Sequence, residues 1–529
     1  MNLTAFLRLS AVCLTGILYP LCFPDFDLGW LAWVVLVPLH LGIERFRPGR
    51  AFLWGWLAGV IAFVGVMSWV MTAMTLYGQV PWLVSTLLML LLATYLGAFI
   101  GLYALGVAWG RQCSLKGTVI WDACVWVGLE LLRTHFLSGL PWALFGYSQY
   151  QWLPVIQVAD LTGVYGVSFL IVLVNSTLAS VILWKFKQPP LTALSFPWTA
   201  LSTTVITVAM VLVYGIWQLN TQSQADAKAP HLTIGLVQAN IDQAHKWDEA
   251  YRQETLHRYA DLSKQAARNV DLLIWPEAAT PFLFEREPAY QQEVLQIARA
   301  AQSPLLFGSP ALRHEIDGTP YLYNSAYLLT PSGRIAGRYD KRHLVPFGEY
   351  IPLRTLLFFL EKLVVGIGDF KSGTGPVTLS LRKDNSFQGA RFGVSICFEV
   401  IFPDEVRQLI KDGADFLVTI TNDAWFGESA APYQHFGMVV FRAVENRAAF
   451  ARAANTGISG FIAPDGRILT ATPVFTQEAL TGTIPFRTRT TVYSTVGDAF
   501  AWACVIMATL WILTAKRRIT KRYSSKPLE

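Results

Sequence analysis

Residues 392–399 read Phe-Gly-Val-Ser-Ile-Cys-Phe-Glu, an apolar run that ends in a thiol and a carboxylate. A short apolar run with β-branched members is typical of a buried strand. Similar runs lie at 233–237, 272–275, 304–307 and 416–420, and turn signals lie at 331–333 (Pro-Ser-Gly) and 464–466 (Pro-Asp-Gly). Strands that alternate with helical segments predict a layered α/β domain over about 229 to 486.

This domain contains three side chains that can take part in catalysis. Glu277 follows Leu-Leu-Ile-Trp-Pro, Lys341 lies in Tyr-Asp-Lys-Arg-His, and Cys397 ends the opening stretch. Taken singly, a Glu or Lys is usually a solvated surface charge, and a Cys in a strand is usually part of the core. Taken together, they are the parts needed for covalent catalysis at a carbonyl group.

The chemistry assigns each of the three a role. A thiol with a pKa of about 8.5 is mostly protonated at neutral pH, so a carboxylate must take its proton for attack on a carbonyl. Attack places negative charge on the carbonyl oxygen, which a fixed cation and a backbone N–H stabilise. We therefore expect Glu277 to be the general base, and Lys341 and the backbone amide of Phe398 to stabilise the oxyanion.

Other site chemistries are less consistent with the sequence. His343 and His435 could supply a papain-like Cys–His pair, but the contexts of Glu277 and Lys341 would then be coincidences. The six cysteines fit no zinc or Cys-x-x-Cys spacing, and five of them lie in apolar segments. With no metal-ligand spacing and no phosphate loop, we expect no metal and no cofactor.

Outside this domain the chain is strongly apolar. Of 529 residues, 53% are hydrophobic and 15% charged, against an ordinary charged share of about 25%. Residues 1–220 hold 9 Lys and Arg and 6 Asp and Glu, whereas residues 221–490 hold 27 and 28. This composition excludes a wholly soluble protein and a disordered one.

Eight apolar segments approach the roughly 20 residues that a membrane-spanning helix needs. They lie at 4–22, 28–43, twice between 50 and 111 with a break at 78–81, and at 117–134, 163–184, 198–218 and 499–515. No small-x-small cleavage site follows the first segment, so we expect it to be retained. The predicted organisation is 1–220 with seven transmembrane helices, 229–486 as the α/β domain, 497–515 as an eighth helix, and 516–529 as a cytoplasmic tail.

Segment 117–134 is the weakest of these predictions because Asp122, Glu130 and Arg133 interrupt it. Charges inside a membrane segment can line a substrate path. The simpler interpretation is that they lie near the ends of the span, where they pair or reach toward the interface.

Lysine and arginine mark every second connection between the segments. Basic residues follow the second, fourth, sixth and eighth segments, whereas 23–27, 76–81 and 135–162 contain none. Because cytoplasmic loops are enriched in Lys and Arg, the α/β domain is predicted to face the periplasm from a bacterial inner membrane. The basic excess flanks apolar segments, which favours membrane topology over nucleic-acid binding.

In order and local context, Glu277, Lys341 and Cys397 match the Glu-Lys-Cys pattern of the nitrilase, or carbon-nitrogen hydrolase, superfamily. Residues 1 to about 515 resemble its membrane branch, the apolipoprotein N-acyltransferases. The resemblance rests on Leu-Pro-Trp-x-x-Phe-Gly-Tyr-Ser-Gln at 140–149, Val-Gln-Ala-Asn-Ile and Lys-Trp within 237–247, Trp-Pro-Glu at 275–277, His-Leu-Val-Pro-Phe-Gly-Glu-Tyr-Ile-Pro at 343–352, Cys-Phe-Glu at 397–399, and Thr-Asn-Asp-Ala-Trp-Phe-Gly with Pro-x-Gln-His within 421–435.

The resemblance implies a nitrilase-like αββα sandwich and transfer of an acyl chain between two lipid substrates. The donor would be a phospholipid, typically phosphatidylethanolamine through its sn-1 chain. The acceptor would be the α-amino group of a diacylglyceryl-cysteine in an apolipoprotein. A thioester on Cys397 would link the two half-reactions in ping-pong order, and no cofactor is implied.

The resemblance also implies roles for neighbouring residues. Glu349 would orient Lys341 or the incoming amine, and Glu399 would fix the nucleophile turn, although structural ion pairs are the alternative for both. Trp247 corresponds to a Trp that contacts lipid. Phe398 stands where many relatives carry Tyr, so any role of that hydroxyl is not carried over.

Two apolar stretches suit lipid substrates. Residues 356–365, with Phe358 and Phe359, would form an amphipathic lid, and Trp425 and Phe426 lie in a glycine-containing loop. Ordinary core packing is the alternative for the first stretch. Two rival functions fit the sequence less well: a membrane-tethered amidase or nitrilase has little use for eight spans, and a transporter or receptor has no need for the thiol.

The charge pattern leads to a topology prediction. A cysteine introduced near residue 300 should react in intact cells with a thiol reagent that enters the periplasm but does not cross the inner membrane, whereas one placed after Lys516 should react only after lysis. Labelling in the reverse pattern would overturn the predicted orientation.

Overall fold

The computed structural model describes residues 3–113, 117–186, 196–314, 318–351, 370–381 and 389–524. They fall into two compact units. One, the helical unit, takes in Met1–Ser68, Thr86–Trp217 and Val496–Glu529, and the other, the α/β unit, takes in Trp69–Ser85 and Gln218–Thr495. The α/β unit therefore includes a short segment from within the apolar N-terminal half.

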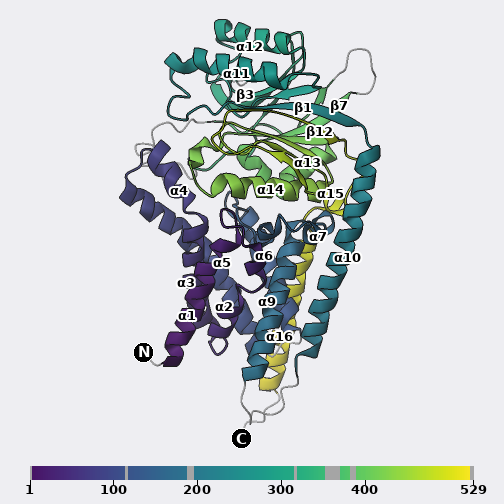
Figure 1. Ribbon diagram of the computed structural model, residues 1–529. Coiled ribbons are helices and arrows are strands. Elements are labelled where there is room, and N and C mark those ends of the chain that lie inside the picture. Colours follow the sequence, from purple (N-terminus) through teal and green to yellow (C-terminus); the bar gives the residue numbers. More distant parts are fainter. Residues whose placement is uncertain are drawn as a thin grey trace. The chain divides into compact units, whose positions relative to one another are not determined.

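The α/β unit contains two six-stranded sheets (Figure 1). The first has the order β12-β1-β2-β3-β4-β5 and the second β11-β10-β9-β8-β7-β6. The strands of the first are β1 His231–Gln238, β2 Leu272–Ile274, β3 Leu305–His314, β4 Pro320–Leu329, β5 Ile335–Asp340 and β12 Glu478–Pro485. The strands of the second are β6 Thr378–Leu381, β7 Ala390–Ile396, β8 Phe416–Thr421, β9 Phe450–Ala454, β10 Gly460–Ile462 and β11 Ile468–Ala471. In each sheet three central strands are parallel (β1-β2-β3 and β7-β8-β9) and the outer pairings are antiparallel.

The core between the two sheets forms because successive side chains of each strand point to opposite faces. In β1, Leu232, Ile234 and Leu236 point into the same buried cluster as Phe392 and Val394 of β7. Residues of a strand that lie two apart share one face, so a single apolar stripe on each strand is enough to join two sheets. Each such side chain, when fully buried, stabilises the fold by about 1.5–3 kcal/mol.

Helices cover the outer face of each sheet (Figure 1). α11 (Arg252–Ala266) and α12 (Pro288–Ala301) pack on the first sheet through a second buried cluster that includes Tyr259, Trp275 and Phe307. α13 (Pro403–Lys411) and α14 (Ala431–Asn446) cover the second sheet. This arrangement confirms the predicted α/β domain as an αββα sandwich, and all five predicted strands are found.

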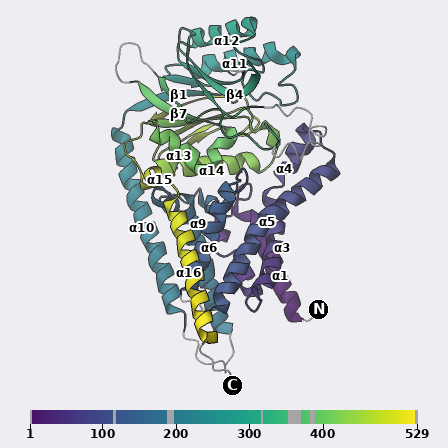
Figure 2. The same cartoon turned by 180° about the vertical axis from the view of Figure 1, so that it is seen from behind.

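The helical unit contains helices at the positions predicted for spans, but segment 28–43 holds only the 3-10 helix Gly29–Trp33 and the six-residue helix α2 (Val37–Gly42) (Figure 2). Its main helices, some of which extend past the unit's boundaries, are α1 Leu3–Leu18, α2 Val37–Gly42, α3 Pro48–Val66, α5 Trp82–Gln112, α6 Thr118–His135, α9 Val164–Phe186, α10 Trp198–Lys228 and α16 Ala499–Ser524. Among the described residues, five segments are long and apolar enough to cross a membrane, namely Ala5–Cys22, α3, α5, α9 and α10. The count of eight spans therefore stays a prediction.

The charges of α6 contact groups of the helical unit itself. Glu130 accepts a hydrogen bond of 2.6 Å from the backbone N–H of Phe145, and Arg133 donates to the carbonyl of Ala143 at 3.3 Å. Asp122 lies 3.9 Å from the imidazole of His40. All three charged side chains are buried and are used at least in part to hold neighbouring segments together.

Two pairs of glycines let α3 and α5 approach each other closely. Gly55 and Gly59 of α3 are four residues apart and face Gly97 and Gly101 of α5, which have the same spacing. A Cβ atom on Gly59 would lie 2.6 Å from the carbonyl oxygen of Gly97, and one on Gly97 would lie 2.7 Å from the backbone nitrogen of Val60. Small residues at such spacing are a common means of packing helices in lipid.

This contact predicts that Gly97→Leu lowers the thermal unfolding temperature of the detergent-solubilised protein by several degrees, because overpacking costs about 1–3 kcal/mol. Gly49→Leu is the matched control, since a Cβ at Gly49 meets nothing within 4 Å. Equal shifts for the two variants would show that the close approach does not contribute to stability.

Candidate active site

Cys397 lies at the end of β7, where the chain leaves the sheet and enters the short 3-10 helix Cys397–Ile401. Its φ is +52°, in the left-handed region that L-residues with side chains rarely adopt. Such a conformation costs about 1–2 kcal/mol and persists only where the surroundings hold it, which is common at functional sites.

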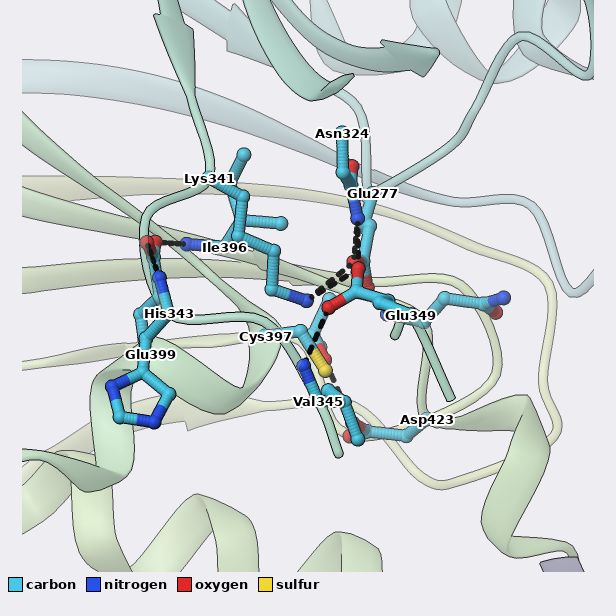
Figure 3. A network of polar contacts seen from close by, with 12 residues as sticks. Glu277, Asn324, Lys341, His343, Val345, Glu349, Ile396, Cys397, Glu399 and Asp423 are labelled. Atoms are coloured by element: carbon cyan, nitrogen blue, oxygen red, sulfur yellow. Dashed lines mark hydrogen bonds and ion pairs between the residues drawn. The ribbon is translucent and has the colours of Figure 1, made fainter. Parts of the chain in front are cut away.

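Glu399 is one of the groups that hold this turn (Figure 3). Its Oε2 accepts a hydrogen bond of 2.6 Å from the backbone N–H of Ile396. Its Oε1 accepts from the hydroxyl of Tyr339 at 2.7 Å and from the backbone N–H of Arg342 at 2.6 Å. One buried carboxylate thereby joins the nucleophile turn to the segment that carries Lys341.

Lys341 follows β5 and lies between two carboxylates (Figure 3). Its Nζ is 2.9 Å from Oε1 of Glu349 and 3.4 Å from Oε1 of Glu277. Burial by itself lowers the pKa of Lys341, but the charges of Glu349 and Glu277 outweigh it, so the pKa is raised and Lys341 is an ammonium ion. The structure thus brings together Glu277, Lys341, Glu349 and Cys397, as the sequence predicts.

Asn324 spans the same two carboxylates. The side-chain amide of this β4 residue donates to Glu277 Oε1 at 2.7 Å and to Glu349 Oε1 at 2.8 Å. The other oxygen of Glu349 accepts from the backbone N–H of Val345 at 2.8 Å. These bonds fix the orientation of both carboxylates, and sequence reasoning did not single out Asn324 because no local motif marks it.

Two more residues that sequence reasoning left without a role contact Glu277. The backbone N–H of Asn422 donates to Glu277 Oε2 at 2.9 Å, and Lys246 Nζ lies 3.3 Å from the carbonyl oxygen of Glu277. Burial lowers the pKa of Lys246 to about 8, and the charge of Glu277 opposes this shift. Lys246 lies in the Lys-Trp motif and Asn422 in the Thr-Asn-Asp motif. Their place in these motifs is the sequence feature that could have identified them.

The thiol of Cys397 is un-ionised at rest. Burial raises its pKa, the negative charge of Glu277 raises it further, and Lys341 only partly opposes these effects. A thiol in this environment loses its proton when a neighbouring base can take it as the new bond forms. The arrangement therefore suits general-base catalysis better than a preformed thiolate.

The two histidines have other partners. Nδ1 of His343 lies 2.7 Å from Glu405, and its ring stacks on Phe402. Nε2 of His435 lies 3.2 Å from the backbone carbonyl oxygen of Cys397. The nitrogen that a papain-like base would turn toward the sulfur is thus engaged with the backbone.

The aromatic residues proposed for lipid contact lie at several places in the α/β unit. Trp247 is 49% exposed, in the loop that also carries Lys246. Trp425 packs edge-on against Tyr77, and Phe426 packs against Trp69. Phe358 and Phe359 lie outside the described residues. No group of three or more His, Cys, Asp or Glu among the described residues could hold a metal ion.

Comparisons with known proteins cover both units. Residues 15–177 match the family model of the apolipoprotein N-acyltransferase N-terminal domain, and residues 233–493 match that of carbon-nitrogen hydrolases. The chain is 41% identical to an apolipoprotein N-acyltransferase of Geobacter metallireducens over 96% of this chain and 94% of that protein. It is 34% identical to one of Azotobacter vinelandii over 89% of this chain and 87% of that protein. An amidase of known structure from Nesterenkonia sp. is 22% identical with a TM-score of 0.36, over 49% of this chain and 92% of its own.

The charge around the thiol leads to a prediction for Glu277→Gln. Removing the negative charge favours the thiolate, so the pKa of Cys397 should fall, and alkylation of the folded protein by iodoacetamide should reach its midpoint about 1 unit lower in pH. Glu254→Gln, an exposed carboxylate on α11, is the matched control. A midpoint that rises, or a loss of alkylation, would mean that Glu277 instead ionises the resting thiol.

Proposed function

The chain belongs to the apolipoprotein N-acyltransferases, and from this premise we propose that Glu277, Lys341 and Cys397 carry its acyl transfer. The enzyme is an acyltransferase of the carbon-nitrogen hydrolase superfamily, and the amidase alternative is not favoured. The observation that carries the proposal is the buried contact of one ammonium with two carboxylates beside the strained cysteine.

In the first half-reaction the donor is an ester. The sulfur of Cys397 bonds to the ester carbonyl carbon while its proton passes to Glu277. Negative charge then develops on the carbonyl oxygen, where Lys341 and the N–H of Phe398 stabilise it. Collapse of this intermediate breaks the carbon–oxygen bond, and the departing alkoxide takes the proton from Glu277.

In the second half-reaction the amine of the acceptor attacks the thioester. Glu277 takes a proton from the attacking nitrogen, and the same two donors stabilise the second oxyanion. The carbon–sulfur bond then breaks, an amide is released, and the cysteine regains its proton. Because one thiol serves both steps, donor and acceptor occupy the site in turn, which is the ping-pong order.

Two further carboxylates and one backbone N–H support the catalytic residues. Glu349 lies 2.9 Å from Lys341 and helps to keep it charged. Glu399 bridges the nucleophile turn and the backbone after Lys341. At Phe398 the side chain has no hydroxyl, so this position contributes its backbone N–H alone.

The substrates follow from the family. The names of the relatives are consistent with a lipoprotein acceptor, and we propose phosphatidylethanolamine as the acyl donor and diacylglyceryl-cysteine as the site that is acylated. Trp247, Trp425 and Phe426 would contact acyl chains, together with the 356–365 segment carrying Phe358 and Phe359.

The site of action follows from the charge pattern of the connections. We propose that the protein lies in the bacterial inner membrane with 229–486 in the periplasm and 516–529 in the cytoplasm. What supports this is the alternation of basic and non-basic connections, together with five described segments apolar enough to cross a membrane.

The nucleophile is tested directly by Cys397→Ser. A serine hydroxyl is far less acidic than a thiol, and a base placed for cysteine does not activate it, so we expect no acyl-enzyme. Intact-mass analysis after incubation with phosphatidylethanolamine should show one added acyl group on the wild type and none on the variant. Cys13→Ser, which changes a cysteine of α1, is the matched control. Normal acyl addition to the serine variant would remove Cys397 from the mechanism.

A further inference from the structure

A buried histidine holds the backbone at the nucleophile. His435 lies on α14, and its Nε2 is 3.2 Å from the carbonyl oxygen of Cys397. A carbonyl oxygen can only accept a hydrogen bond, so Nε2 must carry the proton. The contact therefore specifies which ring nitrogen is protonated.

The other ring nitrogen is fixed by a buried ion pair. Nδ1 of His435 lies 3.1 Å from Nη2 of Arg452 and 3.1 Å from Oδ1 of Asp423. Arg452 in turn donates to Oδ2 of Asp423 at 2.7 Å. Burial and the charge of Arg452 lower the pKa of His435, so the ring is neutral and its Nδ1 can accept from Arg452.

All three side chains are buried, and each comes from a different element: Asp423 from the 3-10 helix Asp423–Phe426 after β8, His435 from α14 and Arg452 from β9. Burial also strengthens the charged contacts because the surrounding dielectric is low. Burial raises the pKa of Asp423, but the charge of Arg452 and a hydrogen bond from the Thr421 hydroxyl oppose it, so the pKa lies well below its usual range. The imidazole is thereby locked in one orientation, with its Nε2–H directed at Cys397.

The carbonyl that His435 contacts belongs to the peptide unit whose other edge is the N–H of Phe398. In a trans peptide the C=O and N–H bonds point in opposite directions. A bond to the carbonyl edge therefore sets the direction of the N–H edge. Rotation of this peptide about its two flanking bonds changes ψ of Cys397 and φ of Phe398, and it would turn the N–H away from the substrate.

We infer that His435 is a positioning residue that holds the Cys397–Phe398 peptide with its N–H turned toward the oxyanion. This inference rests on the proposed function, since it takes Cys397 as the nucleophile and the Phe398 N–H as an oxyanion donor. Loss of one oxyanion donor typically costs about 10²–10³ in rate. A peptide freed to rotate keeps part of that stabilisation, so the expected cost is at least about 10-fold.

Two amide substitutions separate the contact from the fold. His435→Asn carries its amide at the position of Nδ1, where it can meet Asp423 and Arg452 but cannot reach the Cys397 carbonyl. His435→Gln carries its amide nitrogen at the position of Nε2 and can restore the bond. The two variants differ by one methylene, and a structural role limited to the ion pair would be served by His435→Asn and not by His435→Gln.

The experiment uses the full chain in detergent and two reactions of the same thiol. Acylation by phosphatidylethanolamine passes through an oxyanion, whereas alkylation by iodoacetamide does not. We expect His435→Asn to slow acylation at least about 10-fold while alkylation stays within about 2-fold of wild type, and His435→Gln to recover most of the acylation rate. The intact alkylation rate shows that the variant is folded with its thiol in place.

Two results would overturn the inference while leaving the proposed function intact. One is an acylation rate in His435→Asn equal to that of the wild type. The other is a parallel loss of acylation and alkylation in both variants, which would give His435 a structural role alone. Failure of the wild type itself to form an acyl-enzyme would instead remove the proposed function and this role with it.

Discussion

The site depends on the buried ammonium ion of Lys341. Desolvating Lys341 is costly, and the protein offsets that cost with two carboxylates and an amide that spans them. Written with both carboxyl groups ionised, Lys341, Glu277 and Glu349 together carry one net negative charge. The proposed chemistry moves that charge from Glu277 to the substrate oxygen across Lys341 and creates no new charge in a low-dielectric site. Stabilisation of this kind is effective because the groups are fixed before the reaction begins.

The αββα sandwich explains how groups so far apart in the sequence meet. Glu277 follows β2 in one sheet and Cys397 follows β7 in the other, so the packing of the two sheets brings these strand ends together. Loops carry the reactive groups, while the buried stripes of the strands fix their spacing. Asn422, after β8, reaches across to Glu277 from the second sheet. Catalytic precision thus depends on the same side chains that stabilise the core.

Much of this could be predicted from the sequence, for physical reasons that also explain the gaps. Glu277, Lys341 and Cys397 stand in local contexts that report their chemistry, and the strands beside them show a clear apolar pattern. Asn324 could not be found this way, because its role arises from strand register and not from its neighbours in the chain. For His435 the sequence suggests a contact with the thiol of Cys397, whereas the imidazole contacts the backbone carbonyl of that residue. Sequence alone cannot distinguish these two partners. The glycines of α3 and α5 lie within a charge-free stretch, whose apolar length predicts spans but not which faces of two helices meet.

The aromatic contacts of the loop after β8 have a consequence for how the chain can be divided. Tyr77 and Trp69 partly cover Trp425 and Phe426, and they come from a segment more than 300 residues earlier in the chain yet belong to the same compact unit. A truncated protein that begins near residue 229 would lack this cover and expose apolar surface next to Asp423. The nitrilase-like part is therefore not one continuous stretch of sequence, because Trp69–Ser85 belongs to the same compact unit as Gln218–Thr495.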